Sequence, residues 1–178
     1  FIDQLNQVGQ KTGLFKEVTL TRYGRNKNAP FELDVVLDDV PLNVVNVGYG
    51  VSQSMPIIAE IIFRTTPSWF IVQQPEVHLH PRAQAVIGEV IFESALTKKN
   101  FSLIETHSDY LIDRFRLSIK KTRDTLIASE SQVLFFLRQN GENKVIPISI
   151  DENGELSEDQ PEEYRQFFIN EQLKLLES

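Results

Sequence analysis

Two short apolar runs, each followed by a helical pattern, constrain the fold of this chain more than any other feature. Residues 69–72 (WFIV) and 101–104 (FSLI) have the length and composition of strands buried in a parallel sheet. A helical pattern opens at Pro81, at the first helical position that proline prefers, and a second one follows residues 101–104. Strands that alternate with helices at this spacing pair in parallel through crossover connections. We therefore expect an α/β fold with a mostly parallel sheet flanked by helices.

Antiparallel strands are expected at the N-terminal edge of this sheet. Residues 15–21 and 31–37 alternate or run apolar, and the turn-rich segment YGRNKNAP separates them as in a hairpin. Residues 41–47 have the pattern of a further strand. The opening segment, FIDQLNQVGQKTGLFKEV, shows neither a helix-capping pattern nor an initiator methionine and runs directly into strand-like sequence. It is expected to lie in the middle of a longer protein.

Three further helices and one further hairpin are predicted from local patterns. Residues 52–64 have a helical period, with Ser52 as the expected N-cap and Pro56 near the first turn. Thr106 or Ser108 is expected to cap the helix that follows the second apolar run. Near the end of the chain, QVLFFLRQNGENKVIPISI predicts two strands around the turn residues NGEN, and EEYRQFFINEQLKLLES predicts an amphipathic helix.

Charge divides the chain into two parts. The 178 residues have a net charge of −7, but residues 1–150 are neutral, and residues 151–178 carry nine acidic against two basic side chains. We expect residues 1–150 to form one domain and residues 151–178 to form a solvated acidic appendage. The chain has no cysteine, which excludes disulfides and thiolate metal sites. No apolar run approaches the roughly 18 residues of a membrane helix and no signal peptide is visible, so the cytoplasm is expected.

Three short segments carry the residues that could do chemistry. They are NVGYGVSQ (46–53), FIVQQPEVHLHP (70–81) and LIETHSDYL (103–111), and each lies where a strand or loop meets a helix. In parallel sheets this is the end where ligands bind, because helix N-termini and loop amides converge there. Gly48 and Gly50 would let backbone N–H groups approach an anion closely. The first segment therefore suits a phosphate group.

In this order, the three segments resemble the C-terminal half of an ABC-type ATPase domain of the AAA family, related to RecF, SMC proteins and the OLD-family nucleases. VGYGVSQSMPII resembles the signature loop, FIVQQPEVHLHP the Walker B strand with its D-loop, and ETHSDYL the switch-histidine loop. The likeness extends from about residue 40 to the end, including IDENGELSEDQPEEYRQFF. It implies a P-loop NTPase fold that binds and hydrolyses ATP with Mg²⁺ and closes as a head-to-tail dimer.

The resemblance assigns several residues to the dimer interface. Gly48, Gly50 and Ser52, with the neighbouring Gln53, would face the γ-phosphate of a nucleotide held by the partner subunit. His80 falls at the position of the D-loop aspartate, across the same interface. Closure of such a dimer would be coupled to an effector protein or to nucleic acid. DNA repair, phage defence and toxin control are all compatible outputs.

The resemblance places the catalytic machinery at the ends of the two apolar runs. Gln73 falls where the Walker B acid helps to hold Mg²⁺, Gln74 where the catalytic glutamate orients water, and His107 where the switch histidine contacts the γ-phosphate. Relatives often have an acid followed by Gln, so Gln73 is the departure. An amide keeps the shape but loses the charge, which should weaken Mg²⁺ binding and water activation. Glu76 and Glu105 are nearby carboxylates that could partly substitute.

Three explanations of Gln73 stay open at this point: a natural relaxed variant, a catalytically silent nucleotide-sensing scaffold, and a deliberate Glu→Gln change that traps bound ATP. A larger absence is the phosphate-cradling P-loop, since no G-x-x-x-x-G-K-[ST] occurs in the sequence. The simplest interpretation is that a P-loop half lies upstream and is a partner of this chain.

A metal-dependent hydrolase or nuclease is the alternative function. Glu76, His78 and His80, together with His107, could form a zinc or manganese site, because histidines two apart on an extended segment point the same way. A basic stripe could also meet nucleic acid, although a solvated helix face is the simpler interpretation. The stripe consists of Arg114, Arg116, Lys120, Lys121 and Arg123.

Overall fold

The computed structural model describes residues 2–26, 28–161, 163–164, 170 and 173–174, and it divides into two compact units. The first unit is Phe1–Phe115 and the second is Arg116–Ser178. The first unit contains all three of the segments that the sequence singles out, so it is described first. The functional division expected at residue 150 stays a prediction.

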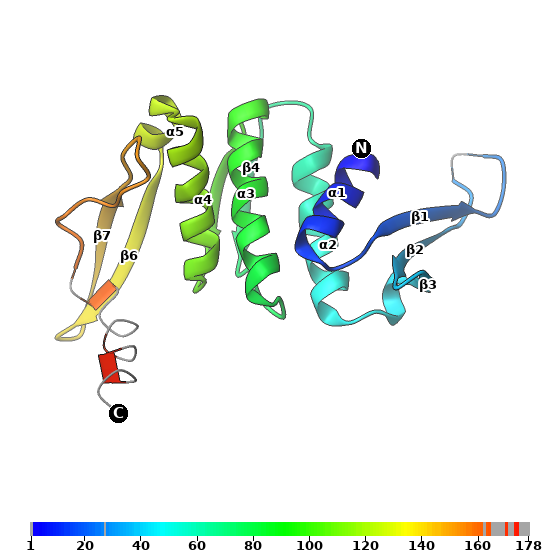
Figure 1. Cartoon of the computed structure of the whole chain (residues 1–178), viewed down its shortest axis with the longest axis horizontal. Helices are drawn as coiled ribbons and strands as arrows, with labels where there is room; N and C mark the ends of the chain where they lie inside the picture. Colours follow the sequence, from blue (N-terminus) through cyan, green and yellow to red (C-terminus); the bar gives the residue numbers. More distant parts are fainter. Residues whose placement is uncertain (1, 27, 162, 165–169, 171–172, 175–178) are drawn as a thin grey trace. The chain divides into compact units, whose positions relative to one another are not determined.

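The first unit alternates helices and strands (Figure 1). Its elements are α1 (Ile2–Thr12), β1 (Glu17–Arg22), β2 (Phe31–Leu37), β3 (Val40–Asn43), the short 3₁₀ helix η1 (Val44–Asn46), α2 (Tyr49–Phe63), β4 (Trp69–Gln73), α3 (Pro81–Lys98), β5 (Phe101–Glu105) and the start of α4 (Asp109–Thr122). The sequence did not predict α1. It forms because Leu5, Val8 and Thr12 repeat at helical spacing and are buried on one face.

β1, β2 and β3 form an antiparallel sheet in that order, which confirms the predicted hairpin. The third strand is shorter than the expected residues 41–47. Its end has a local cause: the side chain of Asn43 accepts a hydrogen bond from the backbone N–H of Val45 at 3.0 Å, which starts η1 in place of further strand.

β4 and β5 pair in parallel, and their register runs from Trp69↔Phe101 to Gln73↔Glu105. Asn100 fixes the beginning of this ladder, because its buried side chain accepts a hydrogen bond from the backbone N–H of Ser68 at 2.9 Å. The predicted α/β fold, with a parallel pair and antiparallel strands on the N-terminal side, is confirmed. Because the ladder ends level at Gln73 and Glu105, it brings two of the three segments to the same edge.

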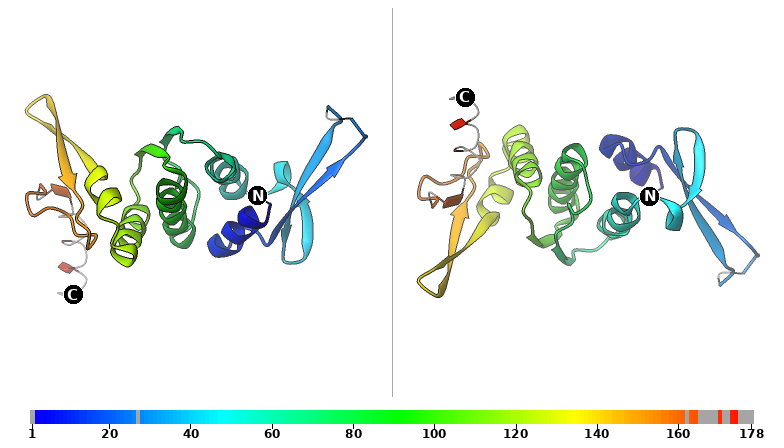
Figure 2. Two further views of the ribbon diagram at one scale, coloured as in Figure 1. Left: turned by 90° about the horizontal axis from the view of Figure 1, so that it is seen from above. Right: turned by 90° about the horizontal axis from the view of Figure 1, so that it is seen from below.

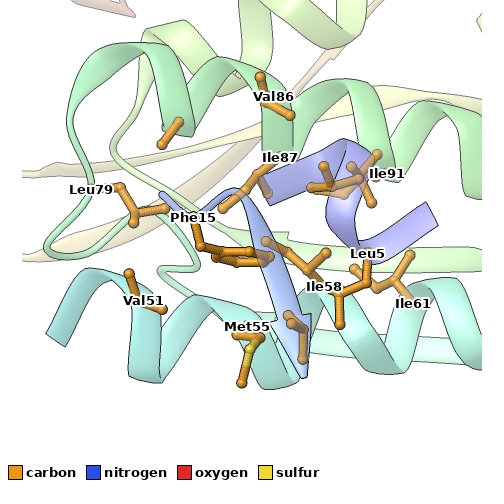
Figure 3. Close-up of a cluster of buried hydrophobic side chains, with 14 of the residues drawn as sticks. Leu5, Phe15, Val51, Met55, Ile58, Ile61, Leu79, Val86, Ile87 and Ile91 are labelled. Atoms are coloured by element: carbon orange, nitrogen blue, oxygen red, sulfur yellow. The ribbon is translucent and has the colours of Figure 1, made fainter. Parts of the chain in front are cut away.

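The core of the first unit lies where α1, α2 and α3 pack together (Figures 1 and 2). Side chains from these helices and from the loop before α3 point toward one another around Phe15 (Figure 3). The ring of Phe15 fills the space at Gly9, where a Cβ atom would come within 2.3 Å of it. The inner face of the parallel pair joins this core through Phe70, with Val72 and Ile104 packed at its edge. The helices α1, α2 and α3 therefore share one core with β4 and β5, and Leu79 anchors the loop before α3 in it.

The second unit contains α5 (Thr125–Glu130) and a hairpin of β6 (Gln132–Gln139) and β7 (Glu142–Ser149). Asn140 and Gly141 connect the strands with positive φ angles of 55° and 85°, as expected for a tight hairpin turn. The hairpin predicted around NGEN is thereby confirmed, whereas the predicted C-terminal amphipathic helix lies largely outside the described residues. Within the described part of the chain, every helix is too short or too polar to cross a bilayer.

An ion-pair cluster connects the outer surfaces of three helices. The carboxylate of Glu89 on α3 contacts the Lys11 ammonium of α1 at 2.8 Å and the Arg114 guanidinium of α4 at 3.0 Å. Partial burial raises the pKa of Glu89, but its hydrogen bonds to Lys11 and Arg114 outweigh burial and lower it below the ordinary 4.5. The hydrogen bond to Glu89 raises the pKa of Lys11. Both shifts favour the charged pair in the folded state.

We expect Glu89→Gln to lower the free energy of unfolding at pH 7 by about 1 kcal/mol, because the cluster is only partly exposed. A lowered folded-state pKa stabilises the protein above the unfolded-state value and loses that effect as the pH falls through the folded-state value. The difference in free energy of unfolding between the parent protein and Glu89→Gln should therefore shrink below pH 4.5. Urea unfolding across pH measures this. Glu93→Gln is the control, because Glu93 reaches Lys11 only at 3.7 Å; equal losses for both variants would contradict the account.

Candidate functional site

Three polar side chains meet where β4 and β5 end. The amide nitrogens of Gln73 and Gln74 each lie 3.2 Å from a different oxygen of the Glu105 carboxylate, so both amides donate to it. The backbone N–H of Gln74 also donates to the carbonyl oxygen of Glu105 at 2.7 Å. Gln73 and Glu105 are exposed and Gln74 is half-buried. A ligand can therefore approach this group from solvent.

The chain turns sharply twice after β4. Gln74 and His78 both have positive φ angles, of 46° and 63°. Residues other than glycine rarely adopt this backbone conformation. Such strain costs of the order of 1 kcal/mol for each residue, and it persists where the surroundings hold it in place. Here the two turns enclose Pro75 and Glu76, both of which are buried. The result is a short loop of residues 75–80, which we call the D-loop only because its sequence resembles that motif.

Glu76 connects the D-loop to the loop that follows β5. One oxygen of its buried carboxylate accepts a hydrogen bond from the backbone N–H of His107 at 2.7 Å. The other oxygen, Oε2, is buried and has no hydrogen-bond partner among the described residues. The His107 side chain is exposed, so the backbone of this loop is held while its imidazole faces solvent. We call residues 105–108 the switch loop only because their sequence resembles that motif.

Gln84 on α3 makes a second connection that the sequence did not predict. Its amide donates to the carbonyl oxygen of Leu79 in the D-loop at 2.8 Å and accepts from the Ser108 hydroxyl at 2.6 Å. Ser108 in turn caps α4, because its Oγ accepts from the backbone N–H of Leu111 at 3.2 Å. Of the two caps expected, Ser108 is therefore the one observed. In the sequence, Gln84 is one of several polar residues along this helix, so no local signal singles it out.

The predicted N-cap of α2 was wrong. The helix begins at Tyr49 with Gly48 as its N-cap, and no side chain caps it. Ser52 lies inside the helix, where its hydroxyl faces the carbonyl oxygens of Gly48 and Tyr49 at 3.5 and 3.4 Å. Pro56 consequently falls in the middle of the helix and leaves the carbonyl of Ser52 without its usual donor. The pattern misplaced the start because two glycines preceded it, although glycine can begin a helix.

The start of α2 lies directly against the D-loop. A Cβ atom at Gly50 would come within 2.8 Å of the carbonyl oxygen of His78, so only glycine allows this approach. The rings of Tyr49 and His78 are 5.7 Å apart at their centroids. Gly48 is different, because a Cβ atom there would meet nothing within 4 Å. Gly50 is thus used for packing, and Gly48 leaves open space in front of the helix N-terminus.

These contacts bring the three predicted segments together as neighbours. The start of α2 touches His78, and Glu76 in the same loop holds the switch loop. His80, the N-cap of α3, and Gln53, on α2, are both exposed and form no side-chain contact that links these loops. The roles of individual residues on a nucleotide stay predictions at this point.

The alternative metal site is not formed. Among the described residues, no three His, Cys, Asp or Glu side chains lie close enough to hold a metal ion. Glu76, His78, His80 and His107 do not form such a group. The segment after β4 turns at His78 in place of running extended, and the Glu76 carboxylate is buried and accepts from the backbone of His107. The interpretation as a metal-dependent hydrolase built on this cluster was therefore wrong.

The strand ends do fit a Mg²⁺ ion that phosphate and water would largely hold. Mg²⁺ prefers oxygen ligands and commonly takes one or two carboxylates from a protein beside substrate phosphates. The group offers the exposed Glu105 carboxylate and the amide oxygens of Gln73 and Gln74. Gln73 itself brings no charge to this group.

The basic stripe is not a free positive surface. Arg114 pairs with Glu89. In the second unit, Arg116 donates to the carbonyl oxygen of Gly154 at 2.7 Å, and Arg116 and Lys120 lie 3.7 and 3.6 Å from the Glu155 carboxylate. Three of the five basic side chains are therefore occupied within their own units, which argues against using the stripe as a nucleic-acid interface.

A family described as the AAA ATPase domain matches residues 2–112, which is more than half of the chain. The chain belongs to this family. Membership covers all three segments, from the start of α2 to the beginning of α4. No curated protein matches the chain significantly. The AAA-family ATPase domain implied by the sequence is thereby confirmed.

The fold is also that of solved SMC ATPase heads. One structure, from work on ATP-driven dimerisation and DNA-stimulated activation of SMC ATPases, aligns over 83% of each chain with a TM-score of 0.56 and 13% identity. An Smc head bound to the C-winged helix domain of ScpA gives 0.61 at 12% identity, and one with an extended coiled coil, from Pyrococcus furiosus, gives 0.60 at 12%. The alignments cover 83% and 97% of this chain, but only 42% and 37% of those two chains.

The two glycines provide a matched test of the site's construction. Gly50→Ser should lower the free energy of unfolding by about 1 kcal/mol, because the clash with the His78 carbonyl exceeds the gain in helix propensity. Gly48→Ser should leave stability unchanged or raise it, because serine is a good N-cap and meets no neighbour. Chemical denaturation measures both. Equal effects would show that α2 does not rest on the D-loop as described.

Proposed function

We propose that this chain is the signature, Walker B and switch half of an ABC-type ATPase, and that it acts on ATP together with a P-loop half. The observation that carries the proposal is the contact path from the start of α2, through His78 in the D-loop, to Glu76 and the His107 backbone. This path joins the three segments that the family uses on nucleotide. Membership of the AAA ATPase domain family supports the same assignment.

On this proposal, the residues that contact phosphate lie in two places, at the start of α2 and at the ends of β4 and β5. At α2, Gly48 leaves open space before an uncapped helix N-terminus, where the first N–H groups and the helix dipole favour an anion. Gly50, Ser52 and Gln53 would place this end on the γ-phosphate held by a second copy. At the strand ends, the exposed imidazole of His107 would contact the γ-phosphate directly.

Gln73 and Gln74 would orient water and metal ligands through their amide groups, and His80 would lie across the dimer interface. A bound Mg²⁺ would neutralise charge on the phosphates. The amides can accept and donate hydrogen bonds but cannot act as a charged base. Hydrolysis should therefore be slow, while nucleotide binding and closure remain possible.

A P-loop half would cover the outer face of the parallel pair. Trp69, Ile71, Phe101 and Leu103 are 72%, 76%, 46% and 53% exposed and share one face, because their positions alternate and pair in register. Parallel sheets are covered on both faces in almost all proteins. The apolar strip ends at Gln73 and Glu105, so an element that covered it would also reach the strand ends.

The proposed dimer pairs two such units head to tail over nucleotide, and its closure would drive an effector protein or nucleic acid. ATP-driven dimerisation and DNA stimulation are described for an SMC ATPase of this fold, and binding to ScpA for two Smc heads. The fold likeness supports the geometry of a closing head.

The test of this function compares ATP binding with and without a P-loop half. The 178-residue chain alone should bind Mg·ATP only weakly, because most phosphate contacts belong to the P-loop. The full-length natural protein, which on this proposal carries the P-loop, should bind it with micromolar affinity. Isothermal titration calorimetry measures both. Micromolar binding of Mg·ATP by the chain alone, or no binding by the full-length protein, would refute the proposal that most phosphate contacts belong to a P-loop half.

The docking of the P-loop half can be followed through Trp69, the only tryptophan in the sequence. Covering the strip should shift Trp69 emission to shorter wavelength and protect it from iodide quenching, because the indole leaves water. Ile71→Glu should abolish the change by placing a charge in the strip, whereas Leu20→Glu, at a half-exposed position on β1, should not. A Trp69 that stays fully quenchable in the full-length protein would rule out this docking face.

Placing a carboxylate at position 73 should accelerate ATP hydrolysis in the full-length protein. Gln73→Glu is expected to raise turnover at least tenfold, a barrier change of about 1.4 kcal/mol, because it returns a charged ligand to the Walker B position. Gln74→Glu should have a smaller effect. Steady-state phosphate release measures both rates. If neither change alters turnover while ATP still binds, the charge that limits hydrolysis does not belong at position 73 or 74, and this account of Gln73 is wrong.

A further inference from the structure

Glu105 is the charged group at the strand ends, and it does not lie on the Walker B strand. It ends β5, directly beside Gln73 in the parallel register. Neighbouring strands are about 4.8 Å apart, so its position is one strand spacing away from the place where the family carries its acid. The sequence named Glu105 only as one of two nearby carboxylates that could partly substitute for the missing charge.

The contacts of Glu105 hold its carboxylate in a fixed position without using up its capacity. Gln73 donates to one oxygen and Gln74 to the other, each at 3.2 Å. An ionised carboxylate offers about four lone-pair sites, so two amide donors leave about two for a cation or its water ligands. The two glutamines thus act as holders of the carboxylate, and they keep their own amide oxygens as neutral ligands.

Glu76, the other carboxylate that the sequence singled out here, is less able to face a cation than Glu105. Glu76 is only 7% exposed, and one of its oxygens accepts from the His107 backbone. Glu105 is exposed at the edge that a ligand approaches. An acid at position 73 would also lie opposite Glu105 in register, where two like charges destabilise a strand pair. A glutamine at 73 and a glutamate at 105 are therefore mutually compatible.

We propose that Glu105 is the metal-directing carboxylate of this ATPase, and that Gln73 and Gln74 position it. The charge of the Walker B strand has moved to the neighbouring strand, and the Mg²⁺ of Mg·ATP is held from β5. This inference rests on the proposed ATPase function and deepens it. It also gives Gln73 a function, which is to position the Glu105 carboxylate.

The test measures how much Mg²⁺ strengthens ATP binding to the full-length protein. ATP affinity is determined by calorimetry in Mg²⁺ and in EDTA, and Mn²⁺ bound with ATP is counted by electron paramagnetic resonance. Glu105→Gln should reduce the Mg²⁺-dependent gain in affinity at least tenfold and weaken Mn²⁺ binding, while ATP binding in EDTA stays as in the parent. The double variant Glu105→Gln/Gln73→Glu returns one carboxylate to the same register pair and should restore the gain. Glu17→Gln, at an exposed carboxylate on β1, should change nothing.

Each outcome decides the inference separately from the function. If the parent binds ATP and Glu105→Gln keeps the full Mg²⁺-dependent gain, Glu105 does not direct the metal, although the ATPase function stands. If Glu105→Gln loses the gain but the double variant does not recover it, the residue acts by supporting the structure and the inference is also wrong. If the parent binds no ATP under any condition, the proposed function itself fails.

Discussion

The hydrogen bond between the buried Glu76 carboxylate and the His107 backbone is the interaction on which the candidate site depends. A buried carboxylate is costly unless hydrogen bonds satisfy it, and a hydrogen bond to a charged group contributes about 2 kcal/mol. This bond fixes the D-loop and the switch loop to each other at the ends of β4 and β5. Gln84 makes a parallel connection between the same two loops. The two loops are therefore linked by two separate hydrogen-bonded connections.

The same arrangement explains why the site is incomplete within this chain. The helices α1, α2 and α3 cover one face of the parallel pair, and the other face presents Trp69 and Ile71 to solvent. The uncapped start of α2 and the strand ends present N–H groups, amides and one carboxylate. The printed sequence contains no P-loop motif that would enclose a phosphate. The residues that the resemblance assigns to nucleotide thus lie together at one end of this unit, and on our proposal most of the nucleotide contacts come from the P-loop half.

Periodicity and turn chemistry in the sequence predicted the parallel strands, both hairpins and the segments that meet at the site, because these signals are local. Three features could not be predicted in this way. The helix α1 has few strong signals and depends on packing against α2 and α3. The position of Gly50 against His78 and the links made by Glu76 and Gln84 depend on tertiary contacts. The alternative histidine metal site assumed an extended segment, which the left-handed conformation of His78 interrupts.

Amide hydrogen exchange in the full-length protein, with and without Mg·ATP, tests the central claim most directly. If the three loops form one nucleotide-responsive unit, the amides of residues 48–53, 76–80 and 107–108 should gain protection together, over the same range of ATP concentration. The His107 amide is the most informative, since its hydrogen bond to Glu76 joins two of the loops. Protection that appears in one loop while the others exchange as before would contradict the account.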